Sequence, residues 1–153
     1  MPPLLSEDII RHSTLLATSF TQVTGQRLLE EDLSGAALAE ALYQAPFVLL
    51  SHGTQPDPVF NYANRTAQRL WEMDWERFTS LPSRFSAEPV AMAERQALME
   101  EARQKGFLSD YSGVRISSTG RRFLIQNAIL WNVHDQEGAY RGQAAIFKDW
   151  KFL

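Results

Sequence analysis

The first part of the chain carries apolar residues at near-helical spacing. These positions are Ile9, Leu16, Phe20 and Val23. Ser6 precedes the pattern and is a typical helix N-cap residue, whereas Gly25 follows it and is a typical C-terminal stop. We therefore expect an amphipathic helix, which either packs over the rest of the protein or serves as a dimerisation helix.

After this helix the pattern changes from helical to extended. Residues 38–45 predict a short helix that ends at Pro46, because proline disfavours helical backbone in the residue before it. Residues 47–51 form a continuous apolar run that is too short for a helix of its own and predicts a central strand. The turn sequence QPDP at residues 55–58 leads into residues 59–62, which predict the returning strand.

Three helices are predicted next. Asn64 is a typical N-cap for a helix that continues through Trp71, and Asp74 can cap a second short helix. Pro89 suits the first turn of a longer helix that ends near Gly106. One broad apolar face of this helix contains Met92, Leu98, Met99 and Ala102.

The remainder of the chain predicts three strands, at residues 107–117, 122–133 and 141–150. The turns between them contain Gly120 and Gly138, which favour tight hairpins. Together with the first pair these strands make five. Because the helices are bunched between the second and third strands, the order indicates an α+β fold.

The composition narrows the class of protein. With 153 residues, 44% hydrophobic and 22% charged, the chain fits one globular domain. A net charge of −3 gives no basic surface for direct nucleic-acid binding, and no apolar segment is long enough to cross a membrane. We expect a cytoplasmic protein. The absence of cysteine excludes disulfides and thiol chemistry.

No catalytic or metal-binding motif stands out. Ser51 and His52 are neighbours in a predicted strand, so their side chains point to opposite faces and cannot act together. The three histidines are not spaced as a preformed metal site, and no phosphate-binding glycine loop occurs. We therefore expect no enzyme activity, no catalytic residue and no metal.

Four phrases of the sequence resemble a known family. APFVLLSHGTQ, FNYANRTA, DYSGVRISSTGRRF and GQAAIF are similar to the MEKHLA domain, a PAS-like family, and the resemblance covers roughly residues 38–150. It implies a five-stranded antiparallel sheet in the order 2-1-5-4-3 with helices on one face. It also implies sensing or interaction more than catalysis. The chain then divides into an N-terminal helical extension, residues 1–34, and a PAS-like domain, residues 35–153.

A PAS-like fold suggests a ligand site between the sheet and the helices. Strict alternation places one face of the strand at residues 122–133 toward this space, with Asn127 as a buried amide that either contacts a ligand or is satisfied by the core. The face contains Phe123, Ile125, Asn127, Ile129 and Trp131. Further residues that could line the same space, or form plain core, are Trp71, Phe85, Met92, Met99 and Tyr111.

Other features bear on the ligand. Flavin is not favoured, because the cysteine motif of flavin-binding relatives is absent and Phe147 stands where they carry glutamine in the last strand. The cofactor is unknown. Arg115 could form a small cationic patch on the sheet with Arg121 and Arg122.

The leading hypothesis is a non-catalytic PAS-like module for sensing, ligand binding or protein interaction, which signals through a homodimer or a partner protein. One alternative is a small cone-shaped α+β enzyme with a polar group in the cavity. The other is a purely structural dimerisation domain.

Overall fold

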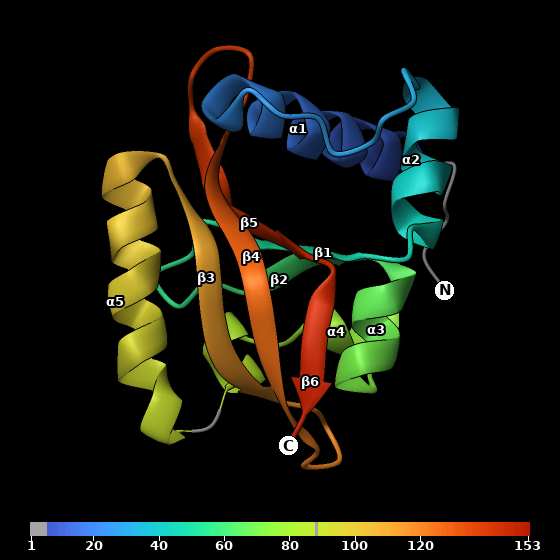
Figure 1. Ribbon diagram of the computed structural model, residues 1–153. Coiled ribbons are helices and arrows are strands. Elements are labelled where there is room, and N and C mark those ends of the chain that lie inside the picture. The colour runs from blue at the N-terminus through green and yellow to red at the C-terminus, as the bar shows by residue number, and fades with distance from the viewer. Residues whose placement is uncertain (1–5, 88) are drawn as a thin grey trace.

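The backbone forms one antiparallel sheet. A computed structural model describes residues 6–87 and 89–153, and the side chains of residues 89–92 lie outside the description (Figure 1). The strands are β1 (Val48–His52), β2 (Phe60–Ala63), β3 (Phe107–Ile116), β4 (Arg122–His134), β5 (Tyr140–Phe147) and β6 (Asp149–Phe152). The order β2-β1-β5-β4-β3 confirms the order that the family resemblance implies, and β6 pairs with β4 beside this path.

The helices occupy both sides of the sheet. They are α1 (Glu7–Thr24), α2 (Gly35–Gln44), α3 (Arg65–Trp71), α4 (Trp75–Phe78), the 3-10 turn η1 (Ser83–Ser86) and α5 (Pro89–Lys105). In β1, Val48 and Leu50 belong to the core beneath α3, α4 and α5, whereas Leu49 belongs to the core beneath α1 and α2. Because side chains alternate along a strand, the two cores lie on opposite faces. Among the described helices, none is both long and apolar enough for a bilayer crossing.

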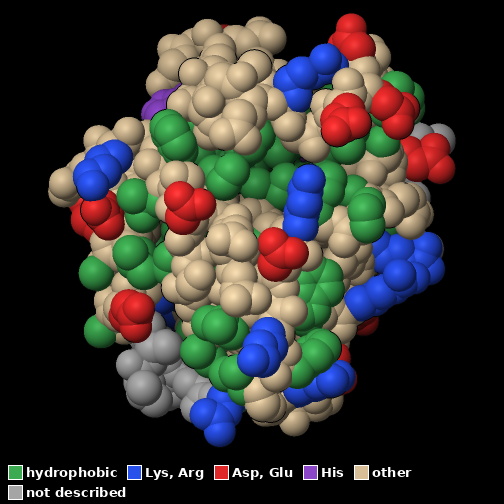
Figure 2. Space-filling view, viewed as in Figure 1, with side chains coloured by type: hydrophobic (Ala, Val, Ile, Leu, Met, Phe, Trp, Pro, Cys, Tyr) green, Lys and Arg blue, Asp and Glu red, His purple; other side chains and the backbone are tan. Residues whose placement is uncertain are grey.

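Helix α1 forms as its sequence predicts. The Ile9 N–H donates to Oγ of Ser6 at 3.3 Å, and Gly25 ends the helix in the left-handed region at φ 73°. Its buried face packs on the sheet, where the Phe20 ring meets Trp131 edge-on with 4.7 Å between ring centres. Hydrophobic side chains gather just below this helix in Figure 2, where it meets the sheet. The packing interpretation of α1 therefore describes the monomer, and a dimerisation role stays a prediction.

The sheet bends along one line that crosses three strands. Asp110 in β3 and Asn127 in β4 both have left-handed backbone, with φ of 57° and 54°. The last predicted strand, residues 141–150, breaks after Phe147 into β5 and β6 at the same level, because Ile129 pairs with Ile146 but Gln126 pairs with Asp149. The prediction of one final strand is therefore wrong. The extra residue that each bulge inserts bends its strand.

Asn64 ties α3 to the sheet and to α2. Its Oδ1 accepts from the Ala67 N–H at 3.1 Å and from the Leu49 N–H at 3.2 Å, and its Nδ2 donates to the carbonyls of Leu42 and Phe47. The side chain is fully buried. The predicted N-cap is confirmed, and the same amide also joins three elements that are distant in sequence.

We predict that Asn64→Ala lowers the free energy of unfolding by about 3 kcal/mol or more, because it leaves several buried backbone groups without partners. The matched control is Asp74→Ala, which removes an exposed cap with one bond to the Arg77 N–H and should cost about 1 kcal/mol or less. Urea unfolding of both variants is the measurement. Equal losses would show that Asn64 acts as a cap only.

The left-handed backbone at Asn127 gives a second prediction. Asn127→Gly should leave stability nearly unchanged, whereas Asn127→Val should cost about 1–2 kcal/mol, because a β-branched side chain disfavours positive φ. The control is Gln126→Val at the adjacent position of ordinary strand geometry. If valine is tolerated equally well at both positions in urea unfolding, the bulge does not lie at Asn127.

Candidate functional site

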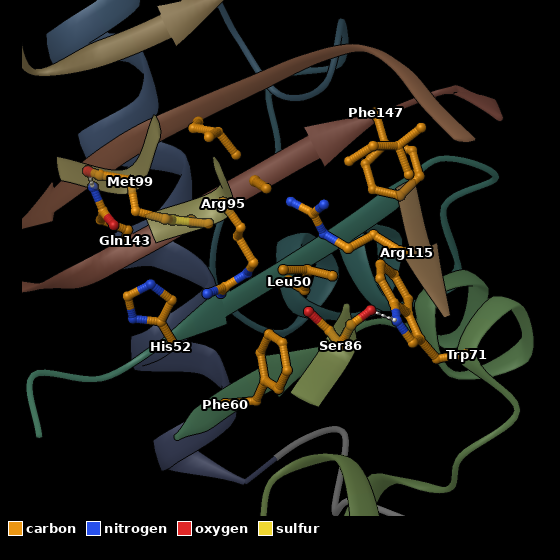
Figure 3. A pocket seen from close by; sticks show the side chains of 14 residues that line it. Leu50, His52, Phe60, Trp71, Ser86, Arg95, Met99, Arg115, Gln143 and Phe147 are labelled. Atoms are coloured by element: carbon orange, nitrogen blue, oxygen red, sulfur yellow. Dashed lines mark hydrogen bonds between the residues drawn. The ribbon is translucent and has the colours of Figure 1, made fainter. Parts of the chain in front are cut away.

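A small cavity lies between the sheet and α5 (Figure 3). Its volume is about 30 Å³. A buried water needs roughly 10–15 Å³ measured in this way, so the space holds about two water-sized groups. The PAS-like interior of this chain is thus mostly filled by its own side chains.

The cavity lining combines an apolar shell with several polar groups. The apolar part is Leu50, Phe60, Trp71, Met99, Ile125, Leu130, Ala144, Ala145 and Phe147. The polar part is His52, Ser86, Arg95, Arg115 and Gln143. An apolar lining with a few converging polar groups is usual in ligand sites, although such sites are larger, at roughly 300–1,000 Å³.

Some residues predicted from the sequence do meet at this cavity. Trp71, Met99 and Ile125 line it, and Phe123 and Tyr111 are buried in the hydrophobic core around it. The Trp71 indole donates to the Ser86 carbonyl at 3.4 Å, which joins α3 to η1 at the cavity wall. The side chain of Met92 lies outside the described residues. Ligand contact by any of these residues stays a prediction.

The strand face predicted for β4 is wrong beyond residue 125. Asn127 is exposed, and its Nδ2 donates to Oδ2 of Asp149 at 3.4 Å. The bulge at Asn127 shifts the alternation by one residue, so Leu130 faces the cavity while Ile129 and Trp131 face α1. The Trp131 indole donates to Oγ of Ser19 in α1 at 3.1 Å.

Phe85 also lies away from the cavity. It sits in η1 with 45% of its surface exposed, and the guanidinium of Arg84 stacks on its ring at 4.1 Å. The prediction that it lines the interior is wrong, because the chain forms a separate 3-10 turn after α4. In that turn Ser83 and Ser86 are buried, and Phe85 points outward.

Sequence reasoning missed the charged residues of the cavity. Arg95 stands three residues after Met92 and four before Met99, so helical spacing puts it on the same face of α5 as these methionines. Arg115 lies four residues after Tyr111, on the same face of β3. Both arginines are 95% buried, so Arg115 does not join Arg121 and Arg122 in an exposed patch.

Arg115 is held by neighbours in its own strand. Its guanidinium donates to the Tyr111 hydroxyl at 2.7 Å and to the Val114 carbonyl at 2.8 Å. Gly113 stands between Arg115 and Tyr111, and a side chain there would lie only 2.4 Å from the tyrosine oxygen. The glycine therefore leaves the room in which the two side chains meet.

Arg95 reaches the cavity from α5. Burial lowers the pKa of Arg95 to about 10, and the positive charge of Arg115 contributes to the shift, while Tyr111 opposes it. Burial also lowers the pKa of His52, and Arg95 adds to this effect. In residues 6–87 and 89–153, no carboxylate forms an ion pair with either cavity arginine.

A surface cleft adjoins the cavity. It has a volume of about 590 Å³ and lies between the β1–β2 loop, residues 53–58, and α5. Four residues line both spaces, namely His52, Arg95, Met99 and Gln143. Arg95 thus stands at the boundary between the cleft and the cavity.

A serine and a histidine do meet elsewhere, between α1 and β1. Nε2 of His12 lies 2.9 Å from Oγ of Ser51, and the Ser51 hydroxyl donates its proton to Oδ1 of Asn61 at 2.5 Å. His12 is therefore the donor to Ser51, the reverse of the proton transfer that a nucleophilic serine needs. Ser51 is also buried. The group joins α1 to the sheet and is not arranged for catalysis.

The same contact predicts a pH dependence. Burial lowers the pKa of His12 from 6.5 to about 4, so below pH 6.5 the unfolded chain binds a proton that the folded chain does not. The contribution of His12 to stability should be constant well above pH 6.5 and fall by about 3 kcal/mol as the pH drops to 4. His12→Gln should remove much of this slope in urea unfolding, and His52 accounts for part of the remainder. An unchanged slope would contradict a buried neutral His12.

Comparisons with known proteins agree with this geometry. Residues 10–152 match the MEKHLA domain, and no curated protein sequence matches the chain. The structure is similar to the PAS domain of a protein from Colwellia psychrerythraea, at 12% identity and TM-score 0.64, with 75% of this chain and 92% of that chain covered. It is also similar to a PAS domain from a two-component sensor histidine kinase, at 24% identity and TM-score 0.57, with 74% and 91% covered. A light-oxygen-voltage domain from work with a flavin analogue gives 16% identity and TM-score 0.60, with 76% of this chain and 84% of that chain covered. The fold is PAS-like, and the match over most of its length shows that the chain belongs to the MEKHLA domain family.

Proposed function

We propose that this protein is a non-catalytic sensory domain of the PAS type, which binds a small molecule between its sheet and α5 and passes the change to a partner protein or a second copy. The observation that carries this proposal is the cavity itself, with polar groups converging in an apolar shell beside an open cleft. A small molecule can reach the interior from the cleft past Arg95.

Two strands offer a physical connection from the cavity to α1. In β1, His52 lines the cavity and its neighbour Ser51 contacts His12 of α1. In β4, Leu130 lines the cavity and its neighbour Trp131 contacts Phe20 of α1. A ligand that binds one arrangement of these strands better than another would shift the equilibrium toward that arrangement, and α1 would move with it. The size of the shift is limited by the difference in affinity for the two arrangements.

The polar groups of the cavity favour binding over catalysis. Nδ1 of His52 is hydrogen-bonded to the Gly53 carbonyl at 3.0 Å. Gln143 donates to the Met99 carbonyl and to Oδ1 of Asn132. Within the described chain, no group of three metal-ligating side chains comes together. The lining thus presents hydrogen-bond donors and positive charge, without a nucleophile paired to a base.

Native mass spectrometry of freshly purified protein tests the proposal. We expect a retained small molecule that is lost in Ala145→Val, which adds two methyl groups at the cavity wall, and kept in Ala17→Val, which adds the same groups on α1. The molecule should return chemically unchanged after incubation, since the domain is non-catalytic. The same spectra report the number of subunits.

A protein that carries no small molecule, and whose unfolding temperature no metabolite in a panel changes, would contradict ligand binding. If that protein is a dimer, the structural dimerisation hypothesis takes its place. Conversion of the molecule to a product would instead favour the cone-shaped enzyme.

A further inference from the structure

Two arginines line the cavity, and neither has an acidic partner among residues 6–87 and 89–153. We infer that this site binds the carboxylate group of a small organic acid, held between Arg95 of α5 and Arg115 of β3. The inference names the ligand class of the sensory site and rests on the proposed function. Figure 3 shows both guanidinium groups among the side chains that line the cavity.

Most donors of the two guanidinium groups have no partner among the residues that the structure describes. Each group carries five N–H donors. Arg115 donates to the Tyr111 hydroxyl and to the Val114 carbonyl, and these bonds fix its orientation toward the cavity. Within the described chain, the Arg95 side chain donates no hydrogen bond and has no carboxylate partner. The unused donors of both groups are therefore available to a ligand.

The two buried arginine charges are unfavourable in the ligand-free protein. An ionised group removed from water is strongly disfavoured unless it is paired and hydrogen-bonded. Arg95 and Arg115 are each 5% exposed and are close enough for the charge of one to act on the other. Positive His52 would add to this repulsion, and burial keeps it neutral by lowering its pKa. An anion between the arginines would offset the repulsion between their positive charges.

The size of the space favours carboxylate over phosphate. About 30 Å³ accommodates two water-sized groups, which matches the two oxygens of a carboxylate and not the four of a phosphate. Guanidinium and carboxylate groups are both planar and form paired hydrogen bonds. Apolar walls formed by Leu50, Leu130 and Ile125 exclude water and strengthen these bonds.

The rest of the acid would lie in the adjoining cleft. Arg95 borders both spaces, so a carboxylate bound to it can carry a chain that extends toward the β1–β2 loop. In the cleft, Asp57 is already paired with Arg84 at 3.1 Å. Glu100, Arg103 and Tyr140 line the same cleft, and Arg103 can receive a second polar group of the ligand.

Calorimetry and thermal unfolding of the full chain test the inference. The probes are acetate, succinate and citrate at constant ionic strength, with acetamide and succinamide as neutral isosteres and with chloride and inorganic phosphate as inorganic anions. We expect at least one carboxylate to raise the unfolding temperature in a saturable manner. The amides and the inorganic anions should not.

Three variants assign the response to the site. Arg95→Gln and Arg115→Gln should each weaken carboxylate binding by about tenfold or more, since each removes charged hydrogen bonds. They should also raise the unfolding temperature of the ligand-free protein, because each relieves the repulsion between buried charges. Arg121→Gln makes the same change at an exposed arginine just before β4, which stacks on Phe152 and not on the cavity, and should leave carboxylate binding unchanged.

Tyr111→Phe provides a milder check should the arginine variants fail to fold. It removes the hydroxyl that orients Arg115, keeps the ring, and should weaken carboxylate binding while the ligand-free protein stays folded.

The outcomes separate this inference from the proposed function. A neutral molecule retained in native spectra, with no response to carboxylates, would overturn the inference and leave the sensory function intact. Phosphate binding that depends on both arginines would overturn the choice of carboxylate. Carboxylate binding that is equally strong in Arg95→Gln and Arg115→Gln would overturn the site.

Discussion

The bend across β3, β4 and the last strand is the constraint on which the rest of the structure depends. It runs through the left-handed residues Asp110 and Asn127 and through the break at Lys148. Trp71 packs across this line, against Phe123 of β4 on one side and Phe147 of β5 on the other, with 5.0 Å and 6.2 Å between ring centres. Trp71 and Phe147 also line the cavity, so this contact across the bend forms part of its wall.

The bend is also the point beyond which the sequence no longer predicted which face of β4 each residue lies on. Hydrophobic periodicity and capping residues located the helices and most strands, because Ser6, Asn64 and Asp74 each act on neighbours a few residues away. The bulge at Asn127 carries no comparable local signal, since asparagine is also common in turns and on surfaces. One inserted residue then reversed the face of Ile129 and Trp131.

The cavity arginines show a different limit. Both stand at positions that helical or strand spacing assigns to the interior, next to Met99 and Tyr111. Their charge argues for the surface, since arginine is rarely buried without a partner. The charge of these residues predicted an exposed position and their spacing predicted a buried one, and the spacing was correct. Such conflicts are expected at functional sites, where a chain accepts an unfavourable local arrangement.

Helix α5 is attached to the sheet unevenly. Gln143 and Asn132 donate to the carbonyls of Met99 and Arg103, both at 2.8 Å, and these bonds lie C-terminal to Arg95. The C-terminal half of the helix is thus anchored one turn away from the charged residue. This arrangement lets a change at Arg95 alter the helix locally while its link to β4 and β5 persists.

The packing of α1 on Trp131, Val133 and Ile146 has a consequence for assembly. If the helix leaves, these side chains form one apolar patch on the sheet, which water disfavours. A second chain can cover that patch only where α1 has vacated it, so self-association through this face and a docked α1 compete for one surface. Assembly there is then an exchange of one helix for an equivalent one, and its affinity reflects only the difference between the two packings.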